Sequence, residues 1–230
     1  MKKLGLSNNQ LKIIAMICMT LDHVGFSLYP EVTWLRILGR LAFPIYAFMI
    51  AEGCRHTRSM PRYFGAMALM ALICQIAYFV AMDSLYMCIL VTFSISIVLI
   101  GLLKKAQQSQ SPFFILLFAI GVATALYLCQ WGNRLLPGTD FDIDYGFIGV
   151  MLPVCLYGAK DKSTKFSVLV LSMTMLAVIS PDPYQWYGLL AAPLLLLYNG
   201  KRGRWNMKTF FYLFYPMHLA VLYGISYVLK

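Results

Sequence analysis

The chain has 230 residues, of which 60% are hydrophobic and 12% are charged, and its mean hydropathy is +0.71. Soluble domains are about 45–50% apolar and about 25% charged, so this chain has too few polar residues to cover a soluble fold and is too hydrophobic to be disordered. Its formal net charge of +10 comes from short basic loops between apolar runs, and no basic stripe with interleaved aromatic residues indicates nucleic-acid binding. The composition predicts an integral membrane protein that contacts lipid over most of its surface.

Apolar runs of about 17–25 residues, the length at which a helix crosses a bilayer, predict an all-α fold. We expect a polytopic membrane bundle of about nine transmembrane helices that forms one domain over residues 1–230. The expected spans are 10–29, 34–53, 63–82, 85–103, 112–131, 143–159, 165–181, 185–199 and 209–229. The sixth to eighth are short and contain Pro153, Pro181, Pro183 and Pro193, so a broken or re-entrant segment would give eight to ten spans.

The positions of lysine and arginine predict the orientation, because cytoplasmic loops carry an excess of these residues. With the N-terminus in the cytoplasm, fourteen basic residues fall on the cytoplasmic side: Lys2, Lys3, Arg55, Arg58, Arg62, Lys104, Lys105, Lys160, Lys162, Lys165, Lys201, Arg202, Arg204 and Lys208. Only Arg134 and Lys230 fall on the outer side, where acidic residues gather. The split predicts a cytoplasmic N-terminus and a C-terminus outside.

Ionisable residues gather in the first two spans, where each costs several kcal/mol unless it has a partner or a function. Lys12 and His23 are eleven residues apart, about three turns plus roughly 20°, so they share one face of the first span about 16 Å apart. Asp22 lies about 100° around the helix from His23. A carboxylate beside a histidine can orient the ring as a general base, but this angle also allows Asp22 to pair with an arginine. A structural hydrogen bond is the alternative role of His23.

In the second span, Arg36 and Arg40 are four residues apart and share a face at the outer end. Two roles stay open for them: an ion pair with an acidic residue (Asp22, Asp142 or Asp144), or binding of an anion or a developing oxyanion. Pro44 predicts a kink in this helix, and Gly39 predicts the close approach of a neighbour.

The second span ends in AEGCRHTRS, at the cytoplasmic membrane surface. Topology alone accounts for Arg55 and Arg58, yet basic residues with a histidine at a helix end also suit a phosphate-bearing ligand that arrives from the cytosol. The candidate cofactor-binding residues are Lys12, Glu52, Arg55, His56 and Arg58. A plain salt bridge is the alternative role of Glu52.

No metal site is predicted. The acids of DFDIDYG, at positions 140, 142 and 144, lack the ligand run of a calcium loop, and the six cysteines form no CxxC or Cys/His pattern. The three acids are expected to bind a cationic or amine acceptor or to pair with the arginines. His218, in the ninth span, is expected to form a helix–helix hydrogen bond.

Several segments resemble the TraX family, the membrane proteins linked to N-terminal acetylation of conjugative pilin. They are LKIIAMICMTLDHVG, LRILGRLAFPIYAFMIAEGCRHTRS, IDYGFIGVMLP and FYLFYPMHL, and together they extend over most of the chain. A looser resemblance points to membrane acyltransferases of the acyltransferase-3 type, which carry an arginine, ten residues and a histidine in their first span. This chain has Lys12 in place of that arginine, ten residues before His23.

The resemblance implies an acetyl-CoA-dependent acetyltransferase of the bacterial cytoplasmic (inner) membrane, with pilin as the acceptor in the family. For this chain the expected acceptor is a pilin or a surface glycan or lipid-linked group, between which the residues do not choose, and no metal is expected to take part. His23 is then expected to deprotonate an amine or hydroxyl, with Asp22 tuning it and Arg36 or Arg40 stabilising the oxyanion. The phosphates of acetyl-CoA would lie near Arg55, His56 and Arg58, with Lys201, Arg202 and Arg204 as further candidates. Two alternatives are a proton-coupled small-molecule transporter and a non-enzymatic membrane assembly subunit.

Overall fold

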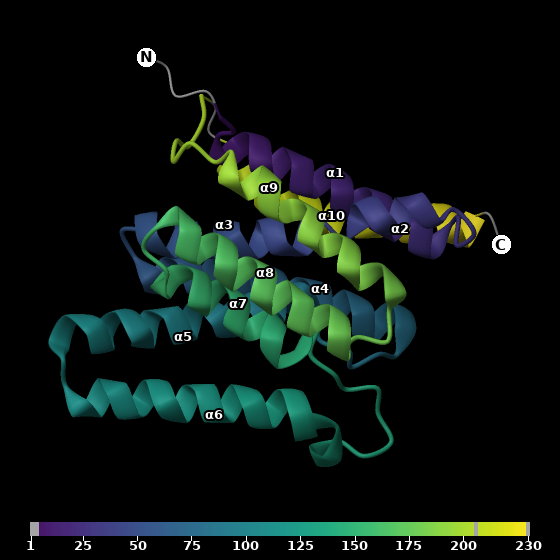
Figure 1. Ribbon diagram of the computed structural model, residues 1–230. Helices are drawn as coiled ribbons and strands as arrows, with labels where there is room; N and C mark the ends of the chain where they lie inside the picture. The colour runs from purple at the N-terminus through teal and green to yellow at the C-terminus, as the bar shows by residue number, and fades with distance from the viewer. Residues whose placement is uncertain (1–4, 205–206, 229–230) are drawn as a thin grey trace. The chain divides into compact units, whose positions relative to one another are not determined.

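The structure is a computed structural model that describes residues 5–204 and 207–228 (Figure 1). Every regular element among these residues is helical, in agreement with the all-α prediction. In chain order the elements are α1 (Asn8–Ser27), α2 (Thr33–Gly39), α3 (Ala42–His56), α4 (Met60–Met82), α5 (Ile89–Ser109), α6 (Pro112–Leu135), α7 (Gly146–Gly158), α8 (Lys162–Ile179), the 3-10 helix η1 (Pro183–Leu190), α9 (Ala191–Leu196) and α10 (Lys208–Val228).

Six helical segments in the described part of the chain are long and apolar enough to cross a membrane. They are Thr33–His56, Met60–Met82, Ile89–Ser109, Pro112–Leu135, Lys162–Ile179 and Thr209–Ser226. The expected spans 10–29, 143–159 and 185–199 coincide with α1, α7 and the pair η1–α9, which are not among the six. α7 has 13 residues, and η1 with α9 is equally short. The structure therefore supports a multi-pass membrane protein without confirming the count of nine.

The contacts of the chain fall into two compact units. Unit 1 comprises Met1–Met49 with Ala159–Lys230, and unit 2 comprises Ile50–Gly158. The boundary falls inside α3, after Met49. Each unit is described by itself below.

Unit 1 joins the first helices of the chain to the last. α1 packs against α2 and α10, while η1 packs against α2, α8 and α9. The loop after α9 is tied to the start of α1, because the backbone N–H groups of Asn8 and Asn9 donate to the carbonyls of Lys201 and Arg202 at 2.8 and 3.1 Å. Ser7 caps α1 together with Gln10 in a reciprocal capping box, which satisfies orphan donors at the helix start.

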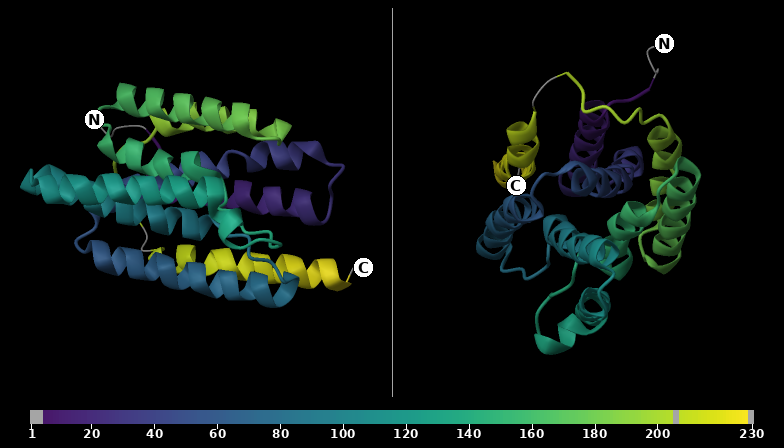
Figure 2. Two further views of the ribbon diagram at one scale, coloured as in Figure 1. Left: turned by 90° about the horizontal axis from the view of Figure 1, so that it is seen from below. Right: turned by 90° about the vertical axis from the view of Figure 1, so that its left-hand side faces the viewer.

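Unit 2 is organised around α5, which packs against α4, α6 and α7. The end-on view of Figure 2 shows α5 between α4 and α6. Buried hydroxyls join α5 to the α7 region: Thr92 donates to the carbonyl of Asp144 at 2.8 Å, and Ser96 donates to that of Val150 at 2.8 Å. Short polar side chains thus allow close packing without unpaired hydroxyls.

The expected kink near Pro44 is a two-residue interruption, at Arg40 and Leu41, within the helical segment Thr33–His56. Proline has no N–H to donate to the carbonyl four residues earlier, which here belongs to Arg40. α2 accordingly ends at Gly39, and α3 begins at Ala42. The break leaves Arg40 at the C-cap of α2, with its side chain directed to the polar cluster described next.

Candidate functional site

Four charged side chains from three elements of unit 1 form a compact cluster, the ion quartet: Asp22 of α1, Arg36 and Arg40 of α2 and its C-cap, and Asp182, the N-cap of η1. Asp22 bonds both arginines, at 3.1 Å to Arg36 and 2.5 Å to Arg40. Asp182 also reaches both, at 3.4 Å each. Two positive and two negative charges balance, which is how a low-dielectric environment tolerates ionised groups.

The quartet is packed closely from both sides. Asp22 touches Gly39, where a Cβ would collide with its side chain, so the expected close approach at this glycine is confirmed. Gln185, 3% exposed, accepts a hydrogen bond from Arg40 at 3.4 Å through Oε1. Gly188 gives room for Met173 and lies near the carbonyl of Arg40. The arginines therefore hold α1, α2 and η1 together.

His23 does not pair with its neighbour Asp22; its partner is His218 of α10. The two rings are joined by a hydrogen bond of 2.9 Å between Nδ1 of His23 and Nε2 of His218. Their centroids are 5.0 Å apart. The helix–helix hydrogen bond expected of His218 is thus present. Asp22, the residue before His23 in α1, belongs to the ion quartet, so the histidine pair lies beside it.

The direction of the hydrogen bond between the two histidines follows from the partner of the second ring nitrogen of His218. Nδ1 of His218 lies 3.0 Å from the carbonyl oxygen of Phe214, and a carbonyl can only accept. In a neutral pair, His218 therefore carries its proton on Nδ1 and accepts at Nε2, so His23 donates from Nδ1. The lone pair of His23 then lies on Nε2, and no described residue forms a hydrogen bond with that atom. This is the arrangement that a general base requires.

Lys12 and His23 share a face of α1, as their spacing predicts, and that face is turned to α10. Nζ of Lys12 lies 5.0 Å from the ring centroid of Phe211, and His23 meets His218 further along the same helix. Lys12 is therefore engaged by an aromatic ring inside unit 1.

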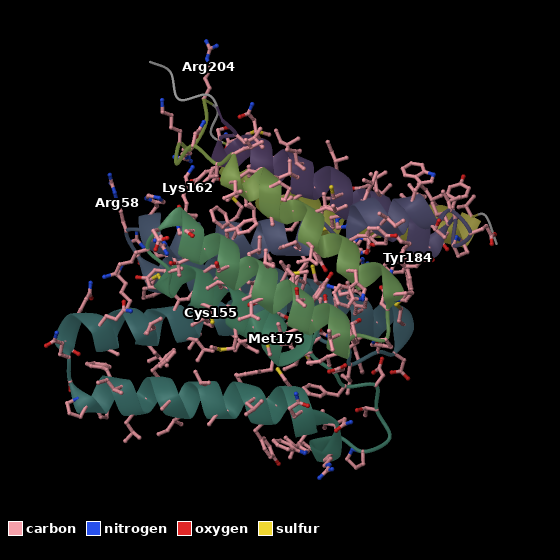
Figure 3. The ribbon with its side chains drawn as sticks, in the orientation of Figure 1. Arg58, Cys155, Lys162, Met175, Tyr184 and Arg204 are labelled. Atoms are coloured by element: carbon pink, nitrogen blue, oxygen red, sulfur yellow. The ribbon has the colours of Figure 1, made fainter. Side chains whose placement is uncertain are left out.

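The residues at the end of α3 lie in unit 2 and divide into buried and exposed groups. Glu52 is 6% exposed and pairs with Arg55 at 3.5 Å and with His56 at 3.6 Å. Arg55 also donates to the carbonyls of Leu156 and Tyr157, at 2.8 and 2.7 Å, where α7 ends. Arg55 thus secures the C-terminal end of α7, a favourable place for a cation, and Glu52 pairs with Arg55 there. His56 is exposed, and Arg58 extends away from the helix end (Figure 3).

The acids before α7 have partners within unit 2. The hydroxyl of Ser84 and the backbone N–H of Leu85 donate to Asp140 and hold the pKa of its carboxyl below the usual range. Asp144 accepts a hydrogen bond from the hydroxyl of Tyr86 at 2.8 Å. Among the described residues, no group of three or more histidine, cysteine or acidic side chains is arranged to hold a metal ion.

Sequence reasoning named Asp22, His23, Arg36 and Arg40, and the structure brings all four to one place. It missed Asp182 and Gln185 as partners of the arginines, and it did not link His218 to His23. Asp182 carried a usable signal: it precedes Pro183, as an N-cap residue before a helix start does, and it lies in an expected outer loop, the side to which Arg36 and Arg40 were assigned. The direct pairing of two histidines 195 positions apart had no local signal.

The family model described as TraX protein matches residues 7–226. The chain belongs to the TraX family. It is 29% identical, over 96% of each chain, to a Dichelobacter nodosus protein named probable fimbrial assembly protein FimC, serogroup H1. It is 26% identical to Protein TraX of Escherichia coli, over 92% of this chain and 84% of that protein. A stretch of 38 residues is 55% identical to an uncharacterized protein of Rickettsia prowazekii, covering 16% of this chain and 15% of that protein. No solved structure matches the chain.

Proposed function

We propose that this TraX-family protein is a membrane acetyltransferase that moves an acetyl group from cytosolic acetyl-CoA to an amine or hydroxyl acceptor. A pilin is the favoured acceptor, because one relative is named a fimbrial assembly protein, and a surface glycan or lipid-linked group is the alternative. The observation that carries the proposal is the orientation of His23. Its ring is fixed by His218 in the tautomer that leaves Nε2 available as a base.

In the proposed reaction, the acceptor nitrogen or oxygen attacks the thioester carbonyl while Nε2 of His23 takes its proton. The new bond to the acetyl carbon forms, the C–S bond breaks, and the CoA thiolate recovers a proton as the free thiol. Arg36, the more exposed arginine of the ion quartet, is the candidate to stabilise the oxyanion. Asp22 acts on the reaction through the arginines that it holds, rather than by orienting His23.

Acetyl-CoA enters this proposal as a substrate whose phosphates need exposed basic side chains. Arg55 is bonded to the end of α7 and Glu52 pairs with Arg55, so in unit 2 the exposed His56 and Arg58 are the better candidates. In unit 1, Lys201 and Arg204 are exposed on the loop tied to the start of α1. Fifteen residues of α1, about 22 Å of helix, separate Asn8 from His23, and the pantetheine arm would cover that length.

We further propose nine crossings of the bacterial inner membrane, with the N-terminus in the cytoplasm and the C-terminus outside. The basic residues of the loops support this orientation. Lys2, Lys3 and Lys230 contribute to the charge count and lie outside the described residues.

Transfer of labelled acetyl from acetyl-CoA in membranes containing the protein tests the activity. Wild type should label an acceptor, and His23→Ala should reduce the rate by about 10²–10⁴-fold, because a general base contributes about that much. Ile17→Val, on the exposed face of the same helix, is the matched control and should retain the wild-type rate. Equal labelling by His23→Ala and wild type, at equal folded amounts, would refute the role of His23.

A non-enzymatic assembly subunit is the second candidate, favoured by the charge balance of the ion quartet and by the name of the fimbrial relative. It predicts that His23→Ala supports pilus assembly as well as wild type does. Binding of acetyl-CoA to the purified protein separates the two candidates even when the native acceptor is missing, because only the enzyme requires it.

A further inference from the structure

His218 is surrounded by groups that suit a cation as well as a neutral ring. It is 8% exposed. Both ring nitrogens have partners, since Nε2 meets His23 and Nδ1 meets the carbonyl of Phe214. The Phe214 ring is stacked on it at 5.2 Å with an interplanar angle of 7°, and the Tyr215 ring meets it edge-on at 5.3 Å. A carbonyl acceptor and an aromatic face both stabilise an imidazolium.

The hydrogen bond between the two histidines can exist in two proton arrangements. In the neutral pair, Nδ1–H of His23 donates to Nε2 of His218. If that proton crosses while His23 gains another on Nε2, the bond reverses and Nε2–H of His218 donates to Nδ1 of His23. His218 is then an imidazolium with both N–H groups bonded, and His23 is neutral in its other tautomer. Neither arrangement leaves a ring N–H of His218 without an acceptor.

We propose that His218 is the positioning residue and second proton carrier of a two-histidine relay. It selects the His23 tautomer that presents Nε2, and it takes the Nδ1 proton of His23 when Nε2 accepts one. The source of that proton rests on the proposed function. The tautomer selection does not, because it follows from the bonds within unit 1.

The relay balances for acetyl transfer. The acceptor loses one proton to Nε2 of His23, and His23 passes a different proton from Nδ1 to His218, so one positive charge appears on His218. When the C–S bond breaks, the proton on Nε2 goes to the departing sulfur, and His218 returns its proton to Nδ1 of His23. The charged groups beside His23 are those of the ion quartet, Asp22 and Asp182 with Arg36 and Arg40, and the relay holds the new cation one ring further from the two arginines.

Nitrogen NMR of ¹⁵N-histidine protein in lipid nanodiscs tests the tautomers directly. The chain has three histidines, so a His56→Gln variant assigns the exposed one and leaves the pair. At a pH where the pair is neutral, we expect both His23 and His218 to carry hydrogen on Nδ1, whereas an unconstrained imidazole favours Nε2–H. A wild-type His23 with hydrogen on Nε2 at that pH would overturn the proposal.

Two variants separate orientation from proton uptake. His218→Ala should return His23 to the Nε2–H tautomer, while His218→Gln offers an amide oxygen that accepts from Nδ1 and should preserve the wild-type tautomer. Met217→Leu, on the exposed face of α10, is the matched control and should leave the His23 signals unchanged. An unchanged His23 tautomer in His218→Ala would refute the positioning role.

Acetyl transfer by the same variants tests the proton uptake. We expect His218→Ala to lose roughly 10²-fold in rate and His218→Gln to recover part of it with a changed pH profile, because the proton then stays on His23. An identical pH profile for His218→Gln and wild type would refute the relay. Correct tautomers without acetyl transfer by the wild-type protein, with its acceptor present, would leave the positioning role intact and refute the proposed function instead.

Discussion

Asp22 and His23 are neighbours in the chain, yet they serve different helices. Consecutive residues of an α-helix point about 100° apart, so side chains at adjacent positions face different neighbours. Asp22 is directed to α2, where it bonds both arginines, and His23 is directed to α10, where it bonds His218. One dipeptide thus joins the ion quartet to the histidine pair, so the two clusters lie side by side.

The ion quartet depends on its charge balance. Asp22→Leu removes one of two carboxylates and leaves a positive charge without compensation in a partly buried place. We expect the free energy of unfolding to fall by about 3 kcal/mol, the cost of breaking a buried ion pair from one side. Adding Arg40→Met should restore a large part of this loss, since Arg36 keeps Asp182 as its partner. Unfolding in mixed micelles measures the free energy of unfolding of Asp22→Leu, of Arg40→Met and of the double variant.

These variants form a double-mutant cycle. Its informative quantity is the coupling energy between Asp22 and Arg40, the difference between the loss in the double variant and the sum of the single losses. Residues in direct contact couple by about 0.5–3 kcal/mol, whereas independent sites give additive losses. Additive losses for Asp22→Leu and Arg40→Met would mean that the ion pair does not hold α1 to α2.

At the scale of elements, the contact between α1 and α2 depends on the missing side chain of Gly39. An added Cβ would meet the Asp22 side chain, which cannot move away because the arginines hold it. Gly39→Ala should therefore destabilise the protein by about 1–3 kcal/mol, the usual cost of overpacking. Gly224→Ala in α10 is the matched control, since nothing lies within 4 Å of its added Cβ.

Gly39→Ala should lower the melting temperature, whereas Gly224→Ala should not. Alanine favours a helix by up to about 1 kcal/mol over glycine, so Gly224→Ala should be neutral or stabilising. Thermal unfolding of purified protein in detergent, followed by circular dichroism, compares the two. A Gly39→Ala protein as stable as wild type would show that α1 and α2 can separate without cost.

The elements themselves were largely predictable from local patterns. Apolar runs predicted the positions of the helices, and Pro44 predicted a kink where the structure has the interruption between α2 and α3, because a proline removes a specific hydrogen bond. The role of Arg55 was not predictable in this way. Its position at a helix end suggested a phosphate site, but its partners are carbonyls of α7, about a hundred residues later in the chain. Only the tertiary arrangement distinguishes a cation that caps a helix from one that awaits a ligand.

For the whole molecule, the sequence predicted the fold class and the location of the charged site, but not which residues pair with one another in that site. Asp22, Arg36 and Arg40 lie within one pair of neighbouring helices, so helical geometry brings them together. Asp182 and His218 come from segments 146 and 195 positions away from their partners, and no local pattern pairs residues over such separations. The sequence also did not determine the number of membrane crossings, because α1, α7 and η1–α9 are too short or too polar for hydropathy to identify them as spans.

Whether α7 crosses the membrane can be decided from the sidedness of the two loops that flank it. If α7 crosses the membrane, Thr139 before it and Lys160 after it lie on opposite sides, and if it does not, they lie on the same side. Nine crossings with a cytoplasmic N-terminus place Thr139 outside and Lys160 inside, as the positive-inside rule favours for Lys160. Both residues are exposed in loops that flank the helix, so each tolerates a reporter side chain.

Single cysteines, Thr139→Cys and Lys160→Cys, placed in a chain whose six native cysteines are replaced by alanine or serine, should therefore differ in labelling. A membrane-impermeant maleimide added to intact spheroplasts should modify Thr139→Cys alone, and lysis should expose Lys160→Cys. Gln110→Cys, in the loop between α5 and α6, is the cytoplasmic control and should follow Lys160→Cys. Labelling of both test positions in intact spheroplasts would mean that α7 is re-entrant, because a 13-residue helix reaches only about 20 Å while a bilayer core measures about 30 Å. The expected result requires α7 to cross with the aid of its flanking residues, which the buried bonds of Thr92 and Ser96 to the α7 region would stabilise.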